Sequence, residues 1–223
     1  GCKKITDFSF LEQCKGLKTL NLERCTEIKD FNFLVHCSNL THLNLSDCGQ
    51  INDISFLEHC KNLIYLNLSD CKQINDMSIL EHCKELTSLF LNRDRNINDF
   101  TVVEHLKNLT TLSLIGCNQI TDTSFFEHCK NLITLDLKYC IKINDFRFLQ
   151  QCNHLRNLSL TGCYQIHDFS FLQYSNELTS LNLTSCGHID NLSFLQYCRD
   201  LESLNLTGCN ISDLSFLQHC KKL

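Results

Sequence analysis

The 223-residue chain lacks most of the features that mark catalytic, metal-binding and membrane proteins. It contains no proline, no tryptophan and no alanine, and it has only seven glycines. No apolar run approaches the roughly 20 residues that a membrane-spanning helix requires, and the first residues, GCKKITDF, lack the apolar core of a signal peptide. No Gly-rich phosphate loop, GxSxG, HExxH or CxxC motif occurs. The sequence therefore predicts no catalytic residue, no cofactor, no metal site and no membrane insertion.

Charge excludes a further class of function. The formal net charge is −5, and the charged residues at the predicted exposed strand positions are balanced in sign. A nucleic-acid-binding surface requires a strongly basic stripe. We therefore expect no nucleic acid as partner.

What the sequence does contain is a strict repeat of 23 residues. Leucine recurs at this spacing in nine copies, at Leu17, Leu40, Leu63, Leu86, Leu109, Leu132, Leu155, Leu178 and Leu201. The repeat reads LxxLxLxxCxxIxDxSFLxxCxx, and a truncated leading copy contains Cys2. An uninterrupted period leaves no linker, so we predict one repeat domain over residues 1–223. Because no polar cap is visible at either end, we expect the sequence to be a piece of a longer protein.

The spacing within one repeat predicts its local structure. The last two leucines of LxxLxL alternate with a polar residue, which is typical of a strand with one buried face. Asp53 stands where a helix N-cap is expected, and Leu57, Cys60 and Leu63 then recur in three-residue steps, the spacing of a short or 3₁₀ helical turn. One such repeat cannot bury its own apolar side, so the copies must stack.

This pattern resembles the leucine-rich repeat over the entire chain. The cysteine that follows LxxLxL is similar to the cysteine-containing repeats of F-box substrate receptors, and I-x-D-x-S-F-L is similar to the bacterial internalin block IxDISPL, with Phe in place of proline. The resemblance implies an α/β repeat fold, a right-handed leucine-rich repeat solenoid or horseshoe. Its parallel sheet lines the concave side, and short helical or 3₁₀ segments form the convex side.

All 17 cysteines fall on two columns of the repeat, nine on the first and eight on the second. Stacked neighbours would have Cα atoms about 5 Å apart, but their parallel Cβ vectors disfavour disulfide geometry. We expect buried structural thiols, at a position where ordinary leucine-rich repeats use Asn to bond the turn backbone. So many free thiols imply a reducing compartment.

Two other repeated features have a functional and a structural interpretation. One is a histidine column on the predicted convex side, at His36, His59, His82, His105 and His128. These histidines either bind a transition metal or, as we expect, form a solvent-exposed stripe. The other is Asn-Leu-Ser/Thr, as at 44–46 and 182–184, which matches a glycosylation acceptor. We expect these segments to be the strands themselves.

Candidate binding residues lie at variable positions of the central strands, where exposed aromatic and arginine side chains predict a protein-binding surface. They are Tyr65, Phe90, Asn92, Arg93, Ile115, Asp136, Lys138 and Tyr139. The fourth repeat also breaks the pattern, because Asp94 replaces the first cysteine within an expected exposed loop, Arg93-Asp94-Arg95. Asp94 either accepts N–H bonds of the turn, as Asn does in ordinary leucine-rich repeats, or belongs to the binding surface.

We therefore expect a protein–protein interaction module with a partner on its concave face and no activity of its own. The internalin-like block favours a bacterial effector in a host cytosol. The alternatives are the substrate-recognition arm of a ubiquitin ligase, and the targeting or autoinhibitory arm of an enzyme whose catalytic domain lies outside this chain. The identity of the partner does not follow from the sequence.

Overall fold

The computed structural model describes residues 1–2, 4–189 and 191–223. The chain divides into two compact units, residues 1–109 and residues 110–223, and each is described by itself. The prediction that the whole chain forms one repeat domain stays a prediction.

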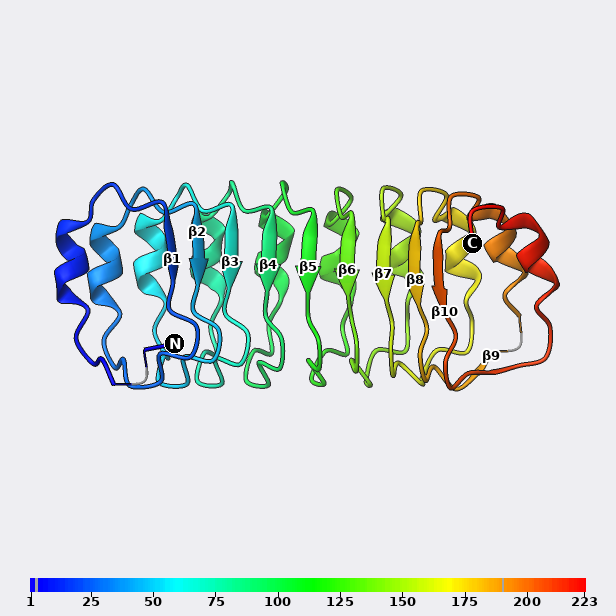
Figure 1. The fold of residues 1–223 in the computed structure, drawn as a ribbon, viewed down its shortest axis with the longest axis horizontal. Coiled ribbons are helices and arrows are strands. Elements are labelled where there is room, and N and C mark those ends of the chain that lie inside the picture. The colour runs from blue at the N-terminus through cyan, green and yellow to red at the C-terminus, as the bar shows by residue number, and fades with distance from the viewer. Residues whose placement is uncertain (3, 190) are drawn as a thin grey trace. The chain divides into compact units, whose positions relative to one another are not determined.

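The first unit contains a parallel sheet in which successive strands are neighbours, as the left part of Figure 1 shows. Its strands are β1 (Thr19–Asn21), β2 (His42–Asn44), β3 (Tyr65–Asn67) and β4 (Ser88–Phe90). The register advances by one whole repeat, so that His42 lies beside Tyr65 and Asn67 lies beside Phe90. Equivalent positions of the repeat therefore form continuous columns across the sheet.

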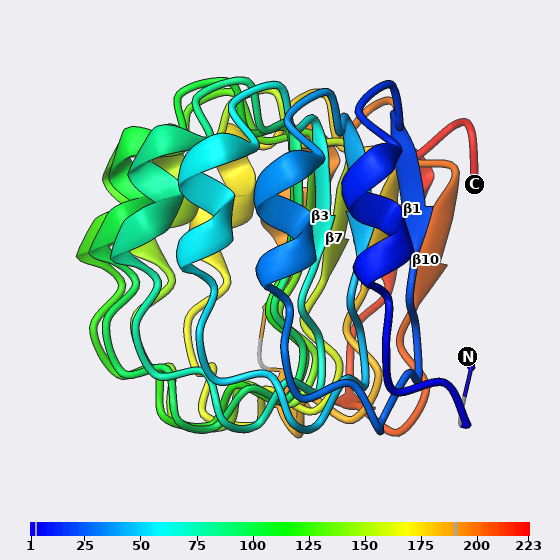
Figure 2. The same ribbon diagram turned by 90° about the vertical axis from the view of Figure 1, so that its left-hand side faces the viewer.

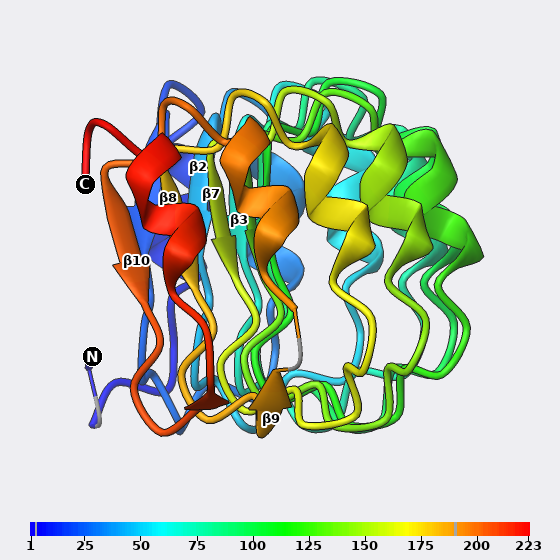
Figure 3. The same cartoon turned by 90° about the vertical axis from the view of Figure 1, so that its right-hand side faces the viewer.

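The second unit repeats this arrangement. Its parallel sheet consists of β5 (Thr111–Ser113), β6 (Thr134–Asp136), β7 (Asn157–Ser159), β8 (Ser180–Asn182) and β10 (Ser203–Asn205). A further pair of two-residue strands, β9 (His188–Ile189) and β11 (Asn210–Ile211), lies beyond the turns of the last repeats. Figure 3 views this end of the unit.

Short 3₁₀ helices form the second layer of each unit, behind the strands (Figures 1 and 2). In the first unit they are η1 (Ser9–Gln13), η2 (Asn32–His36), η3 (Ser55–His59), η4 (Ser78–His82) and η5 (Thr101–His105). In the second unit they are η6 (Ser124–His128), η7 (Arg147–Gln151), η8 (Ser170–Tyr174), η9 (Ser193–Tyr197) and η10 (Ser215–His219). The predicted repeat of strand, turn and 3₁₀ segment is thus confirmed.

The core lies between the two layers. Leu43 and Leu45, the alternating leucines of a strand, are fully buried, and so are Leu57, Cys60 and Leu63, which follow at three-residue steps. The two spacings therefore supply the two walls of one apolar interior, as the sequence predicts. No helix in the described part of the chain combines the length and apolar character that crossing a bilayer would require.

The role of the repeated aspartate differs by one position from the prediction. Asp53 is not the residue that caps η3, because the formal N-cap is Ile54, which has no side-chain bond to the helix. Instead the Ser55 N–H donates to Asp53 Oδ1 at 2.8 Å, which closes a turn two residues long. A short polar side chain prefers this local bond to its own backbone. The contact recurs in both units, for example at Asp76 and Asp168, and fixes where each 3₁₀ segment begins.

Candidate functional site

The residue that precedes the first cysteine column has a left-handed backbone. In the first unit these residues are Arg24, Asp47, Asp70 and Arg93, with φ of 58°, 59°, 60° and 62°. In the second unit they are Gly116, Tyr139, Gly162, Ser185 and Gly208. Glycine tolerates this conformation, whereas it costs an L residue about 1–2 kcal/mol. Arginine and tyrosine are therefore kept in this column against the local backbone preference.

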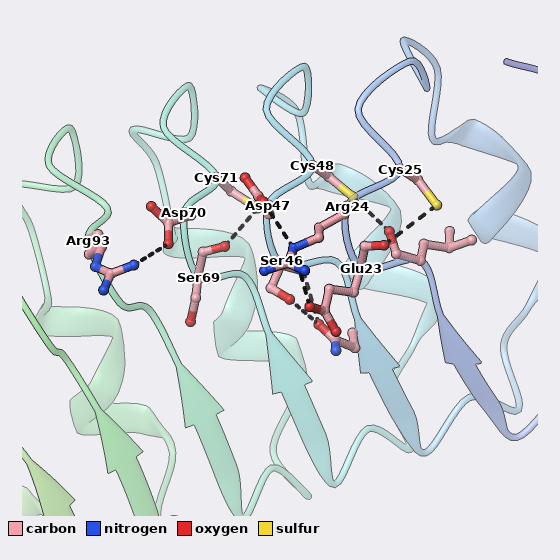
Figure 4. Close-up of polar contacts among 12 residues, drawn as sticks. Glu23, Arg24, Cys25, Ser46, Asp47, Cys48, Ser69, Asp70, Cys71 and Arg93 are labelled. Atoms are coloured by element: carbon pink, nitrogen blue, oxygen red, sulfur yellow. Dashed lines mark hydrogen bonds and ion pairs between the residues drawn. The ribbon is translucent and has the colours of Figure 1, made fainter. Parts of the chain in front are cut away.

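The turn that imposes this conformation is held by the sheet and by the thiols. The N–H groups of Arg24 and Asp47 donate to Ser46 O and Ser69 O of the next repeat, at 2.9 and 2.8 Å. The thiol of Cys48 donates to the Leu22 carbonyl one repeat earlier, at 3.2 Å. Figure 4 shows these contacts along three adjacent turns.

The same thiol contact recurs through the first cysteine column of both units. The distances from Sγ to the leucine carbonyl are 3.2 Å at Cys71, 3.0 Å at Cys140, 3.1 Å at Cys163, 3.0 Å at Cys186 and 2.8 Å at Cys209. The thiol thus supplies the turn bond predicted for it. Fourteen of the 17 cysteines are buried, Cys209 is half-buried, and only Cys2 and Cys14 are exposed. The predicted burial of the thiols is confirmed for these fourteen.

Burial also controls the reactivity of these thiols. Desolvation raises the pKa of Cys48 to about 11 and that of Cys163 to about 12. The thiolate is the reactive form of cysteine, so a thiol that stays protonated at neutral pH is inert. These buried thiols are therefore structural and unreactive at neutral pH.

The four candidate residues of the first unit lie at the end of β4 and beside it. The half-buried rings of Tyr65 and Phe90 have centroids 5.2 Å apart at an interplanar angle of 41°. His42, which is not among the predicted binding residues, stacks on Tyr65 at 6.0 Å and 18°. Its place is predictable, because residues 42 and 65 are one 23-residue step apart.

Phe90 interrupts a structural column. At the equivalent position of earlier repeats, Asn44 Oδ1 accepts the Ser46 N–H at 3.0 Å, and Asn67 Oδ1 accepts the Ser69 N–H at 2.9 Å. A phenylalanine cannot accept such a bond. The N–H of Asn92 donates instead to Ser69 Oγ at 3.2 Å, so a neighbouring hydroxyl takes over the lost contact.

Ion pairs connect the left-handed residues of the first unit. Arg93 Nη1 lies 3.3 Å from Asp70 Oδ2, and Lys72 Nζ lies 4.0 Å from the other oxygen of the same carboxylate. Two repeats earlier, Arg24 Nε lies 3.5 Å from Asp47 (Figure 4). These pairs are solvent-exposed, so each contributes little to stability. They determine instead which charges this edge of the sheet presents.

In the second unit, three candidates are close together on and after β6. Asp136 Oδ2 lies 3.0 Å from Lys138 Nζ, and Asp136 Oδ1 accepts the Lys138 N–H at 3.1 Å. Tyr139 is 54 % exposed and lies against Gly162, where an added Cβ would be 2.5 Å from the tyrosine Cδ1. Only glycine therefore leaves room for this ring. Ile115, after β5, is half-buried.

The candidate residues thus form two groups, one in each unit. Tyr65, Phe90, Asn92 and Arg93 belong to the first, and Ile115, Asp136, Lys138 and Tyr139 to the second. That all eight contact one partner stays a prediction.

The prediction of an exposed loop at Arg93-Asp94-Arg95 is wrong for its central residue. Arg93 and Arg95 are exposed, but Asp94 is only 1 % exposed, because it occupies the inward position of the first cysteine column. The pKa of Asp94 is raised to about 8, chiefly by burial and in part by the charge of Asp70, although the Cys71 backbone and the charge of Lys72 act in the opposite direction. The carboxyl group therefore keeps its proton at neutral pH.

The histidine column lies on the 3₁₀ layer and faces solvent, as predicted. His36, His59, His105 and His128 are exposed and His82 is half-buried. Over residues 1–2, 4–189 and 191–223, no three side chains of His, Cys, Asp and Glu converge in a way that could hold a metal ion.

Comparisons with known proteins agree with this architecture. A family model described as "Leucine Rich repeats (2 copies)" matches residues 38–82, and one described as "Leucine Rich repeat" matches residues 197–214. No curated protein matches the sequence.

The solved structures that are similar in fold include an internalin pair and a Leptospira repeat protein. An internalin (inlF) of Listeria monocytogenes is 23% identical, with a TM-score of 0.73, over 99% of this chain and 70% of that one. Internalin C2 of the same species is 22% identical, with a TM-score of 0.59 and coverages of 95% and 81%. A repeat protein of Leptospira interrogans is 15% identical, with a TM-score of 0.55 and coverages of 98% and 80%. At these identities the similarity shows the fold alone.

Proposed function

We propose that this leucine-rich repeat protein is a protein-binding module whose partner contacts the exposed face of the strands and which performs no chemistry itself. The observation that carries the proposal is the replacement of structural residues by large side chains. Phe90 stands where Asn closes the turn, and Arg93 and Tyr139 stand where glycine is favoured. Side chains kept against the local backbone preference point to a function, and aromatic and arginine side chains are the usual anchors of protein interfaces.

The proposed setting is a reducing compartment, with the protein acting as a bacterial effector in the cytosol of a host cell. The free thiols support the compartment, because 17 cysteines without a disulfide are unusual for an oxidising one. The I-x-D-x-S-F-L block, similar to that of internalins, supports the bacterial source. A ubiquitin-ligase arm and an arm of a larger enzyme are the competing settings, and the sequence that flanks this chain in its gene distinguishes them.

The test compares strand-face variants with matched variants on the 3₁₀ layer. We would immobilise the wild-type chain, capture proteins from host-cell lysate, and quantify each captured protein by mass spectrometry against Phe90→Asn, Tyr139→Ala, His59→Ala and His128→Ala. Phe90→Asn removes the ring and also restores the turn-closing side chain, so the fold is retained. Loss of a hot-spot anchor costs 2 kcal/mol or more, which is about thirtyfold in affinity.

We expect the same captured proteins to be lost with Phe90→Asn and Tyr139→Ala and retained with the two histidine variants. Equal capture by all four variants would contradict the proposal, and so would a loss confined to the histidine variants. Melting temperatures of all four establish that a loss of capture is not a loss of folding.

A further inference from the structure

We propose that the third and fourth repeats of the first unit bind an acidic segment of the partner protein, and that this segment also carries an aromatic or large apolar residue. The inference rests on the proposed function and names the chemistry of the partner. Excess positive charge in the turns, a half-buried aromatic pair and a strained arginine carry it.

Positive charge exceeds negative charge at this corner of the unit. Asp70 is shared by Arg93, at 3.3 Å, and by Lys72, at 4.0 Å. Arg95 is exposed and forms no ion pair with any residue that the structure describes. Two cations therefore contact one carboxylate, one at each oxygen, and Arg95 adds a third cation to the same turns without a carboxylate partner among the described residues.

The first two repeats of the same unit show the opposite balance. There Arg24 lies 3.7 Å from Glu23 and 3.5 Å from Asp47, so one cation contacts two carboxylates. The turns after β3 and β4 thus have more cations than carboxylates, whereas the turn at Arg24 has fewer. On a chain of net charge −5, such a local excess favours a short acidic segment over a long polyanion, which would require a basic stripe.

Asp94 does not restore the balance. It lies in the same turn as Arg93 and Arg95, but its carboxyl group is buried and keeps its proton at neutral pH, because burial raises its pKa to about 8. The Asn96 side chain donates to the Lys72 carbonyl at 2.6 Å. This bond ties the turn that carries Lys72 to the turn that carries Arg95.

The apolar half of the surface adjoins these cations. Arg93 follows Phe90 by three residues, and the Phe90 ring contacts Tyr65 on the adjacent strand. A peptide with an acidic residue and a nearby aromatic residue could place its carboxylate on Arg93 and its ring against Tyr65 and Phe90. Arginine can also bind a carboxylate with two parallel hydrogen bonds, which gives direction to the contact.

The backbone of Arg93 is the third observation. Its φ of 62° is unfavourable for arginine, whereas glycine fills this position three times in the second unit, at Gly116, Gly162 and Gly208. The turn itself therefore does not require a side chain. The guanidinium group is what distinguishes Arg93 from the residue that the backbone favours.

The probe for the test is a phage-displayed library of random peptides, panned against the full chain. We expect the enriched peptides to be rich in Asp and Glu next to Phe, Tyr or Trp. A fluorescein-labelled copy of an enriched peptide is then titrated by fluorescence anisotropy with the wild type, Arg93→Gly, the Lys72→Glu/Arg95→Glu double variant, and the matched control Arg24→Gly. Arg24 occupies the same left-handed column, so the control makes the same change outside the proposed surface.

Arg93→Gly and the double variant are expected to weaken the peptide about tenfold or more, while Arg24→Gly binds as the wild type does. Affinity is also expected to fall as NaCl rises from about 50 to 500 mM. Arg93→Gly relieves the backbone strain, so its melting temperature should equal or exceed that of the wild type, and the loss of binding cannot then be ascribed to unfolding.

Enrichment of neutral or basic peptides would overturn the inference, as would equal weakening by Arg24→Gly and Arg93→Gly. The inference would also be overturned if no peptide were enriched, or if a duplex DNA fragment of matched charge bound more tightly than the peptide in the anisotropy assay. These failures are distinct from failure of the proposed function, which is measured by capture of whole proteins with the Phe90 and Tyr139 variants.

Discussion

Replacing Asp94 should change how the stability of the protein depends on pH. The folded chain holds this carboxyl group with a pKa of about 8, whereas the ordinary value is 3.8. Between these values the unfolded chain is ionised at Asp94 and the folded chain is protonated. The folded state therefore binds one more proton, and the free energy of unfolding falls as pH rises through this window. Below pH 3.8 and above pH 8 the group adds no further slope.

The magnitude follows from the size of the pKa difference. Each unit of pKa difference corresponds to about 1.4 kcal/mol, so a difference of about four units makes this single group contribute a loss of about 6 kcal/mol across the window. The total stability of a small domain is about 5–15 kcal/mol. The loss is thus large enough to shift the unfolding midpoint visibly between pH 5 and pH 8.

The assay is urea unfolding from about pH 5 to pH 8 for the wild type, Asp94→Cys, Asp94→Asn and the control Asp99→Ala. Asp94→Cys restores the pattern of the first cysteine column, in which Cys71 precedes by one repeat and has a pKa raised far above this range by burial. Both Asp94 variants should lose most of the pH dependence. At pH 7.5 Asp94→Cys should unfold at higher urea, with a gain of up to about 2 kcal/mol.

Asp99 contributes a pH dependence of stability opposite in sign to that of Asp94. It is exposed, and hydrogen bonds from the Thr101 side chain and backbone N–H lower its pKa, so it contributes stability above its ordinary pKa that is lost as pH falls. Asp99→Ala should therefore retain the decline of stability from pH 5 to pH 8. If the wild type and Asp94→Asn showed the same pH dependence, the carboxyl group would be ionised in the folded state and the reasoning would be wrong. A fall of several degrees in the melting temperature of Asp94→Cys would show that the carboxyl group has an essential local partner.

Two further predictions concern packing. In the native protein at neutral pH, a thiol reagent should modify the exposed Cys2 and Cys14 rapidly and the other cysteines more slowly. In protein denatured without reductant, the same reagent should titrate close to all 17 thiols. A count near one in the denatured protein would show that the cysteines form disulfides. Gly162→Ala should destabilise the fold in two ways. The φ of +72° costs an alanine about 1–2 kcal/mol, and the clash of the new Cβ with the Tyr139 ring adds a further cost. In a double-mutant cycle measured by urea unfolding, adding Tyr139→Ala should recover only the stability lost to the clash with the ring. Recovery of the full stability would contradict the backbone strain assigned to position 162.

The sequence predicts the strands and the core well because both depend on spacing. Leu43 and Leu45 alternate with a polar residue, and Leu57, Cys60 and Leu63 recur by threes, so the spacing alone assigns each residue to its wall of the core. The aspartate is misplaced by one residue, because Asp53 bonds the N–H two residues on and the 3₁₀ helix begins later than an N-cap would place it. Spacing identifies the turn, whereas the bond geometry decides its boundary.

The candidate site is less predictable. The prediction places Asp94 in an exposed loop with Arg93 and Arg95, although Asp94 occupies an inward column, where a charged residue is rare. The left-handed column has a signal in the sequence, since glycine recurs there at 116, 162 and 208. The contact of Tyr139 with Gly162 has none, because it depends on the direction of a ring. The identity of the partner depends on the partner's surface as well as on this one, so it does not follow from this sequence.

The thiol-to-carbonyl contacts have a consequence for how opening of the protein can be observed. Six thiols of the first column donate across a repeat boundary, as Cys48 does to Leu22 and Cys163 does to Leu137. A reagent can reach such a sulfur only when its own boundary opens, and burial suppresses the thiolate until then. The rate at which each cysteine is alkylated therefore measures the local opening free energy at that boundary. Peptide mapping of the alkylated sites would thus give a repeat-by-repeat profile of stability without any introduced label.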